Sequence, residues 1–286
     1  MLAIILAFVS ATFLGTALVL TQFGLRYVAP LPGAAISIPS FTLAFLLLSP
    51  LLLRNQTIMW SAVPIFAAVG VVFPSVLTLL TFEGNRLLGP VITGALGNLS
   101  PLFAVTLAVI LLGEPLRTLQ IMGLLVIVAG VLIITVRRPQ DVGNWRSWWL
   151  LLPLGAAALR GLIQPVIKIG LEIWPSPIAA GLTGYIVSAL VVLIFARIRT
   201  GRFVTKAPLA GRLWFVAVGL SNGIGVLLMY AALGNGRVSL VAPLVATYPL
   251  MTVGLGTLVL GRVDGATRLA GGTALTVAGV VLLLVG

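Results

Sequence analysis

The sequence contains few charges and lacks two of the reactive side chains. Charged residues make up 8% of its 286 residues, only five of them are acidic, and neither cysteine nor histidine occurs. Without cysteine there is no disulfide and no thiolate nucleophile or metal ligand. Without histidine the commonest general base and the commonest metal ligand are both missing. These absences point away from an enzyme, a metal site and a bound cofactor.

Apolar residues take the place of the missing charges. They make up 60% of the chain, and the mean hydropathy is +1.23. A soluble domain has roughly 45–50% apolar and about 25% charged residues, so an ordinary soluble protein is excluded. A disordered chain is also excluded, because such chains are poor in apolar residues. The solvent that fits this composition is a lipid bilayer.

Apolar runs long enough to cross a membrane recur ten times. A spanning helix needs about 20 apolar residues, whereas these runs are too long for barrel strands, and an open sheet leaves backbone groups unpaired in lipid. The first run lacks the basic start of a signal peptide and is longer than one, so we interpret it as a retained helix. We therefore predict an all-α integral membrane protein with ten transmembrane helices, at 2–23, 32–53, 59–82, 89–112, 119–136, 148–170, 177–196, 213–233, 239–260 and 266–286.

The two halves of the sequence are copies of each other. Residues 101–113 align with residues 249–261, and the Gly-Leu pair at 24–25 aligns with the pair at 170–171. Each copy has five spans, an odd number, so the second copy must enter the membrane from the opposite side. Inverted repeats of this kind are typical of secondary transporters. The predicted domains are a first five-helix repeat at 1–138, a connecting loop at 139–147 and an inverted second repeat at 148–286.

Several motifs resemble those of a known family. The first half has Gly-Asn-Arg at 84–86 and ends a leucine-rich helix with Leu-Leu-Gly-Glu-Pro-Leu at 111–116. The second half has Tyr-Ala-Ala-Leu at 230–233 and Leu-Val-Leu-Gly at 258–261. Over essentially its full length the sequence resembles an EamA-type member of the drug/metabolite transporter superfamily. The resemblance implies a bacterial exporter of amino acids and other small metabolites, with sugar-phosphate translocators among the relatives. The second half departs from the pattern, since Arg262 stands where the first half has Glu114.

Most lysines and arginines gather in one set of loops. Twelve of the 17 lie in loops that follow odd-numbered spans, three lie in the other loops, and two lie within the span 148–170. Cytoplasmic loops are the ones enriched in these residues, so both termini are predicted to be periplasmic. The loop charges are interpreted as topology signals in contact with anionic lipid headgroups, and not as a nucleic-acid site.

The span 148–170 contains the most informative polar residues. Arg160 lies about 18 Å from the start of this span, near the bilayer centre, where inserting an arginine costs on the order of 3 kcal/mol. Gln164 and Lys168 follow at intervals of four residues, so the three share one face. We predict that Arg160 binds an anionic group of the substrate, such as a carboxylate; the alternative is a structural arginine bonded to carbonyls or water. Lys168 is either a second cation of this site or extends to the interface and pairs with Glu172.

No acidic residue falls within a predicted span. All five lie at predicted helix ends or in loops, so Arg160 has no evident counter-ion in the protein. A proton-coupled antiporter built on a membrane-embedded carboxylate has no candidate either, unless the span 59–82 extends to include Glu83.

Proline occurs at matching places in the spans 89–112 and 239–260. Pro101 and Pro249 each remove a helical hydrogen bond, and polar residues precede both. Broken helices are tolerated at membrane depth where they line a cavity; the alternative is an ordinary packing kink. Other polar positions occur in the spans 177–196 and 213–233. The candidate substrate-binding residues are Arg160, Gln164, Asn98, Ser100, Thr247, Tyr248, Tyr185, Ser221 and Asn222, with Lys168 as a possible second cation.

The sequence favours a secondary transporter in a bacterial inner membrane, as a monomer or homodimer surrounded by membrane lipid. It would export amino acids or related small metabolites by alternating access. A membrane enzyme would need paired acids, histidines or a metal cluster, and a channel would show non-saturating flux. The alternative among transporters is a translocator of phosphorylated sugars or other organic anions, which Arg160 and Lys168 together would favour.

Overall fold

Helices are the only regular elements in the part of the chain that the structure describes. This computed structural model describes residues 1–54, 56–77, 80–81, 84, 87–88, 96–135, 147–201, 207–251, 254–255 and 266–286. The helices are α1 (Leu2–Gly24), α2 (Pro30–Leu52), α3 (Val63–Gly70), the π-helical η1 (Val71–Val76), α5 (Ser100–Leu112), α6 (Thr118–Thr135), the short η2 (Ser147–Leu150), α7 (Leu151–Ile173), α8 (Pro177–Thr200), α9 (Leu209–Asn235), α10 (Val238–Val245) and α12 (Ala266–Val285).

Each of the ten predicted spans contains helix, so the prediction of an all-α membrane protein with ten helices is confirmed. Helices α1, α2, α8 and α9, and α7 together with η2, are long and apolar enough to cross a membrane. Most of the predicted connecting loop, together with Glu83 and Arg262, lies outside the described residues.

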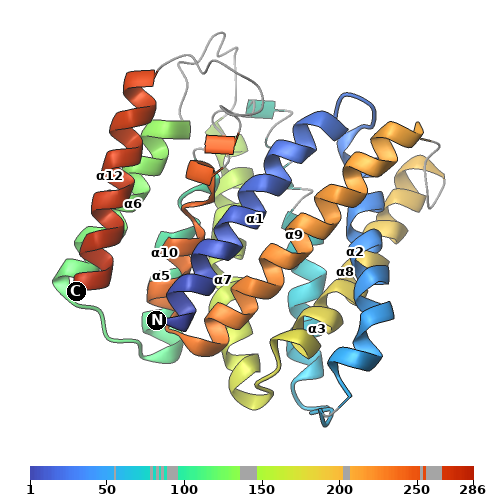
Figure 1. Ribbon diagram of the computed structural model, residues 1–286, viewed down its shortest axis with the longest axis horizontal. Helices are drawn as coiled ribbons and strands as arrows, with labels where there is room; N and C mark the ends of the chain where they lie inside the picture. Colours follow the sequence, from blue (N-terminus) through green and yellow to red (C-terminus); the bar gives the residue numbers. More distant parts are fainter. Residues whose placement is uncertain are drawn as a thin grey trace.

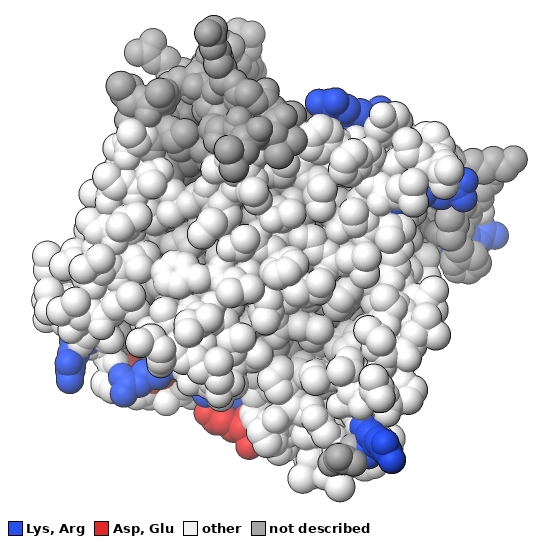
Figure 2. Space-filling model, in the orientation of Figure 1, with Lys and Arg blue, Asp and Glu red and all other residues white. Residues whose placement is uncertain are grey.

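The surface of the bundle matches a lipid environment. On the face shown in Figure 2, charged side chains lie at two opposite ends, and the broad middle between them carries none. Large apolar side chains cover the outside; Leu47 and Ile198, for example, are both 74% exposed. In water such exposure would be unfavourable by about 25 cal/mol for each Å² of apolar surface, whereas lipid tails are as apolar as these side chains.

Helices from the two halves of the chain pack against each other throughout the bundle. Helix α1 lies along α9, α2 packs between α8 and α9, and α5 packs against α7. Figure 1 shows α6 and α12 side by side at one edge of the molecule, with α2 and α8 at the opposite edge. The central cavity described below therefore has walls from both halves.

Both ends of the chain lie at one end of the bundle. Arg117, just before α6, donates from Nη1 to the carbonyl of Gly286 at 2.9 Å, and Ala3 near the start of α1 packs on Gly236. We call this the termini end, and we call the opposite end, where α1 connects to α2, the α1–α2 loop end (Figure 1).

Within the described residues, three of the ten spans are interrupted. Phe73, within η1, has extended backbone angles (φ −126°, ψ 127°) directly before Pro74. The two breaks expected before Pro101 and Pro249 are present as turns at 98–99 and 246–247. The hydroxyl of Ser188 in α8 donates to the carbonyls of Gly70 and Phe73, at 2.6 and 2.9 Å. The backbone carbonyls at the first break thereby gain a hydrogen-bond donor from a neighbouring helix, as backbone groups at membrane depth require.

Candidate functional site

Two adjoining cavities lie inside the bundle. Their volumes are about 200 and 270 Å³, and both are lined by Leu18, Thr21, Phe73, Arg160, Val218 and Asn222. Because they share these walls, we treat them as one central cavity. Its lining is mostly apolar and comes from both halves of the chain. The second part of the cavity extends past Leu25 and Pro30, and so toward the α1–α2 loop end.

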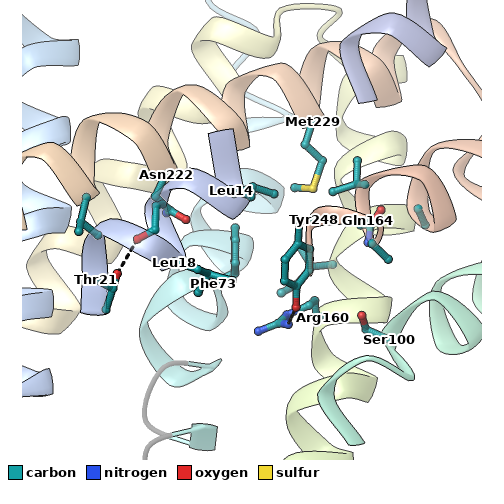
Figure 3. A pocket seen from close by; sticks show the side chains of 16 residues that line it. Leu14, Leu18, Thr21, Phe73, Ser100, Arg160, Gln164, Asn222, Met229 and Tyr248 are labelled. Atoms are coloured by element: carbon teal, nitrogen blue, oxygen red, sulfur yellow. Dashed lines mark hydrogen bonds between the residues drawn. The ribbon is translucent and has the colours of Figure 1, made fainter. Parts of the chain in front are cut away.

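Arg160 lies where the two parts of the central cavity meet. It is half-buried and comes from the middle of α7, about 14 Å from the start of that helix. Its Nη1 lies 3.5 Å from the hydroxyl oxygen of Tyr248, and Figure 3 shows the two side chains pointing toward each other. Within the part of the chain that the structure describes, no carboxylate lies within 4.0 Å of its guanidinium group.

Tyr248 connects Arg160 to the two broken helices. Its hydroxyl donates to Oδ1 of Asn98 at 3.3 Å, and Asn98 lies in the turn before α5. Tyr248 itself follows the turn after α10. The matching breaks of the two halves and the arginine therefore meet at one place.

Gln164 lies one turn beyond Arg160 on α7 and also lines the cavity. Its side chain is 6% exposed, and its Oε1 has no hydrogen-bond partner among the described residues. A buried amide oxygen without a donor costs about 1–3 kcal/mol. Ser100, at the start of α5, lines the same part of the cavity.

A second polar pair lies in the part of the cavity nearer the α1–α2 loop end. Nδ2 of Asn222 in α9 donates to the hydroxyl of Tyr185 in α8 at 3.3 Å, and both residues line that part. The ring of Tyr185 packs edge-on against Phe41, with 4.7 Å between the ring centres. This packing holds the tyrosine hydroxyl toward α9.

The structure places four of the candidate residues outside the walls of the central cavity. Asn98 does not line either part of the cavity, and it accepts a hydrogen bond from Tyr248, which does line it. The hydroxyls of Thr247 and Ser221 donate to backbone carbonyls, Leu244 at 2.7 Å and Phe13 at 2.8 Å. Nζ of Lys168 donates to the carbonyl of Leu233 near the end of α9, at 3.0 Å.

The alternative interpretation of Lys168 also differs from the structure. No nitrogen–oxygen contact of 4.0 Å or less joins it to Glu172. Lys168 and Arg160 are eight residues apart on α7, about 12 Å along its axis, so the two cations do not share one binding position.

Sequence reasoning missed two features of the site. The first is the apolar wall of the cavity, including Phe73 and Met229, for which only Pro74 was a signal. The second is Glu114, which the structure shows to be 8% exposed and bound to the other half of the chain. Among the described residues, no group of three histidines, cysteines, aspartates or glutamates could hold a metal ion.

Comparisons with known proteins agree with this architecture. The sequence model of the EamA-like transporter family matches residues 1–136 and 147–285. The chain belongs to this family. It is therefore a multi-pass membrane protein and a transporter of the drug/metabolite transporter superfamily.

One solved structure, described only as a crystal structure of a protein, has a TM-score of 0.83 to this chain. The two are 18% identical, and the match covers 99% of this chain and 96% of that one. At this identity the likeness shows the fold alone. No curated protein matches the sequence.

Proposed function

We propose that this EamA-family member exports amino acids or related small metabolites by alternating access, and that Arg160 binds the carboxylate of the substrate. The supporting observation is a guanidinium group in the central cavity with no carboxylate within 4.0 Å among the described residues. An arginine at membrane depth is costly, and it is retained where it serves a substrate or ion path. Its planar fork of donors matches a carboxylate.

The rest of the cavity fits a small molecule that is apolar apart from a few polar groups. Its two parts, of about 200 and 270 Å³, place the whole cavity in the lower part of the roughly 300–1,000 Å³ range of small-molecule pockets. Apolar side chains such as Leu14, Leu18 and Met229 would contact the apolar part of the substrate, while Gln164 and Asn222 offer amide groups (Figure 3).

A translocator of phosphorylated sugars or other organic anions is the alternative, and one observation weighs against the phosphorylated substrate. Recognition of a phosphate usually recruits more than one cation. Lys168 binds a carbonyl of α9 and does not line either part of the cavity, so a carboxylate is the better match for the single arginine.

The proposal includes an orientation in the bacterial inner membrane, with both termini periplasmic. It rests on the excess of lysine and arginine in the loops that follow odd-numbered spans. In the structure Arg26 lies two residues beyond the end of α1, and Arg197 and Arg199 lie in the last turn of α8. We propose no enzymatic activity, because the inventory of side chains supplies neither histidine nor cysteine.

Counterflow in proteoliposomes, with a panel of amino acids, sugar phosphates and organic cations, tests the proposed substrate class. Arg160→Ala should lower counterflow of the transported amino acid at least about 30-fold, the usual effect of removing one partner of a buried charge pair. Arg54→Ala is the matched control, since Arg54 is exposed beyond α2; it should stay within about twofold of the wild type. Wild-type counterflow by folded Arg160→Ala protein, or counterflow of sugar phosphates only, would refute the proposal.

A further inference from the structure

Glu114 joins the two halves of the chain at the termini end of the bundle. Its Oε1 accepts a hydrogen bond from the backbone N–H of Val238, and its Oε2 accepts one from Ser239, both at 2.8 Å. Val238 and Ser239 are the first two residues of α10, and both are buried. We call this pair of hydrogen bonds the Glu114 contact.

The local sequence around Glu114 aims its side chain at α10. Gly113 ends α5 in a left-handed conformation (φ 62°), which costs glycine little. The N–H of Gly113 bonds to the carbonyl of Val109, and that of Glu114 bonds to the carbonyl of Ala108, so both N–H groups fold back onto the last turns of α5. The chain thus reverses at the end of α5, and the next side chain lies beside the other half.

Helix α10 needs this carboxylate. The first N–H groups of a helix have no partner within it, and its positive N-terminus favours an anion. Arg237, at the N-cap of α10, makes no capping bond with its side chain. The group that caps α10 is therefore a carboxylate from the opposite half. A separation of the two halves at this end would break the hydrogen bonds between the Glu114 carboxylate and the first N–H groups of α10.

The same two helices also reach the substrate site. Helix α5 begins just after the turn that contains Asn98 and ends two residues before Glu114, and α10 runs back from Val238 toward Tyr248. At the cavity, Tyr248 bonds to Asn98. The α5–α10 pair is therefore connected at both ends, once beside Arg160 and once at the termini end.

Another contact between the halves lies at the termini end. The side chains of Ser176, which precedes α8, and Gln56, which follows α2, form a hydrogen bond. The central cavity extends the opposite way, toward the α1–α2 loop end. The Glu114 contact and the Ser176–Gln56 hydrogen bond thus join the two halves at the termini end in this conformation.

We propose that Glu114 is a positioning residue for transport, whose contact with α10 closes the termini end of the cavity and must open in each transport cycle. The inference rests on the alternating access of the proposed function. The sequence of the second repeat provides no equivalent of this contact. Arg262 stands at the position that matches Glu114, and an arginine side chain cannot accept hydrogen bonds from a helix N-terminus.

Cysteine labelling from each side of the membrane tests this role. The chain contains no cysteine, so Leu14→Cys places a single thiol in the cavity, and Glu172→Cys in a separate protein identifies the face of the termini end. A membrane-impermeant maleimide is then added from the termini face. Glu114→Ala should raise labelling of the Leu14→Cys thiol about tenfold, because the loss of a charged hydrogen bond shifts the equilibrium between the closed and the open termini end by about this factor. Glu114→Gln keeps one acceptor and should give a smaller rise.

The control separates closure from general damage. Glu172→Gln alters an exposed acid near the same end and should leave labelling of the Leu14→Cys thiol unchanged. A merely structural defect would raise labelling from both faces, whereas the proposal requires a rise from the termini face alone. Unchanged labelling in folded Glu114→Ala protein, or an equal rise in the Glu172→Gln control, would overturn the proposal.

A cross-link supplies a second measurement that does not depend on the stability of the alanine variant. In the Glu114→Cys/Ser239→Cys protein, a short bifunctional reagent that joins the two thiols through disulfide bonds should stop counterflow. Reduction of these disulfides should restore it. Unimpaired counterflow in cross-linked protein would show that the two sites need not separate. The labelling requires no substrate, so a failed amino-acid assay and a failed closure remain distinguishable.

Discussion

Replacing Gly219 by alanine tests whether the wall of the cavity depends on direct backbone packing. Gly219 lies in α9 against α2, and a Cβ atom added there would be 2.1 Å from the carbonyl oxygen of Ser37 and 3.0 Å from its Cα. An ordinary carbon–oxygen contact is about 3.3 Å or longer. The two helices would have to separate by about 1 Å, because the obstacle is backbone and cannot rotate away.

The expected loss of stability follows from two opposing effects. Overpacking a close contact costs about 1–3 kcal/mol, while alanine favours the helix over glycine by about 1 kcal/mol. The net destabilisation is about 0–2 kcal/mol, with about 1 kcal/mol as the central value. For a chain of this size each kcal/mol corresponds to about 2–4 °C in the unfolding midpoint, so we expect Gly219→Ala to lower the midpoint by about 3 °C.

The assay is thermal unfolding in detergent at a fixed scan rate, followed by loss of the monodisperse peak in gel filtration. Gly155→Ala in α7 is the matched control, since no atom lies within 4 Å of a Cβ added there; it gains the helix propensity without the clash, and its midpoint should stay or rise. Equal midpoints for the two variants would refute the packing argument. Ser37 and Gly219 both line the cavity, so counterflow should fall as well.

Three further substitutions, one of them with a control variant, test single contacts. Ser188→Ala removes the α8 hydroxyl that donates to two carbonyls at the break after α3, of which that of Gly70 keeps the hydroxyl of Ser75 at 3.2 Å. It should lower the unfolding midpoint by about 4 °C, for a loss of roughly 1–3 kcal/mol. Ser10→Ala, which removes a buried bond from α1 to a carbonyl of α9, should act similarly, whereas Ser40→Ala, whose hydroxyl bonds only within α2, should change the midpoint by less than about 1 °C. Tyr248→Phe removes the hydroxyl beside Arg160; the half-saturating substrate concentration should rise about tenfold while the midpoint changes little.

Apolar run length predicted the helices well, because lipid permits few other structures. In a bilayer every backbone group must be paired within the segment, so composition alone decides that the run from residue 2 to residue 23 is a helix, and α1 ends only one residue later. The breaks in front of Pro101 and Pro249 were predictable for the same local reason, the missing N–H of proline.

Which polar residues line the cavity was less predictable. Asn222 lines it, while its neighbour Ser221 donates to a carbonyl of α1. Thr247 and Tyr248 show the same division, since only the tyrosine lines the cavity. Neighbouring residues on a helix point about 100° apart, and only the position of the facing helix determines which of the two lines the cavity.

The sequence by itself determined the membrane class, the ten helices, the duplication and the position of a costly arginine at membrane depth. The membrane class, the helices and the arginine depend on local composition and on the demands of lipid, which act on each segment separately. The duplication is visible from the similarity of two segments of the sequence. Only the tertiary structure decided that Tyr248 and Asn98 meet beside Arg160 and that Glu114 binds the start of α10. It also decided that Lys168 binds a carbonyl of α9 and does not join this cluster. Those contacts join residues from 65 to 150 positions apart, and their geometry follows from how whole helices pack.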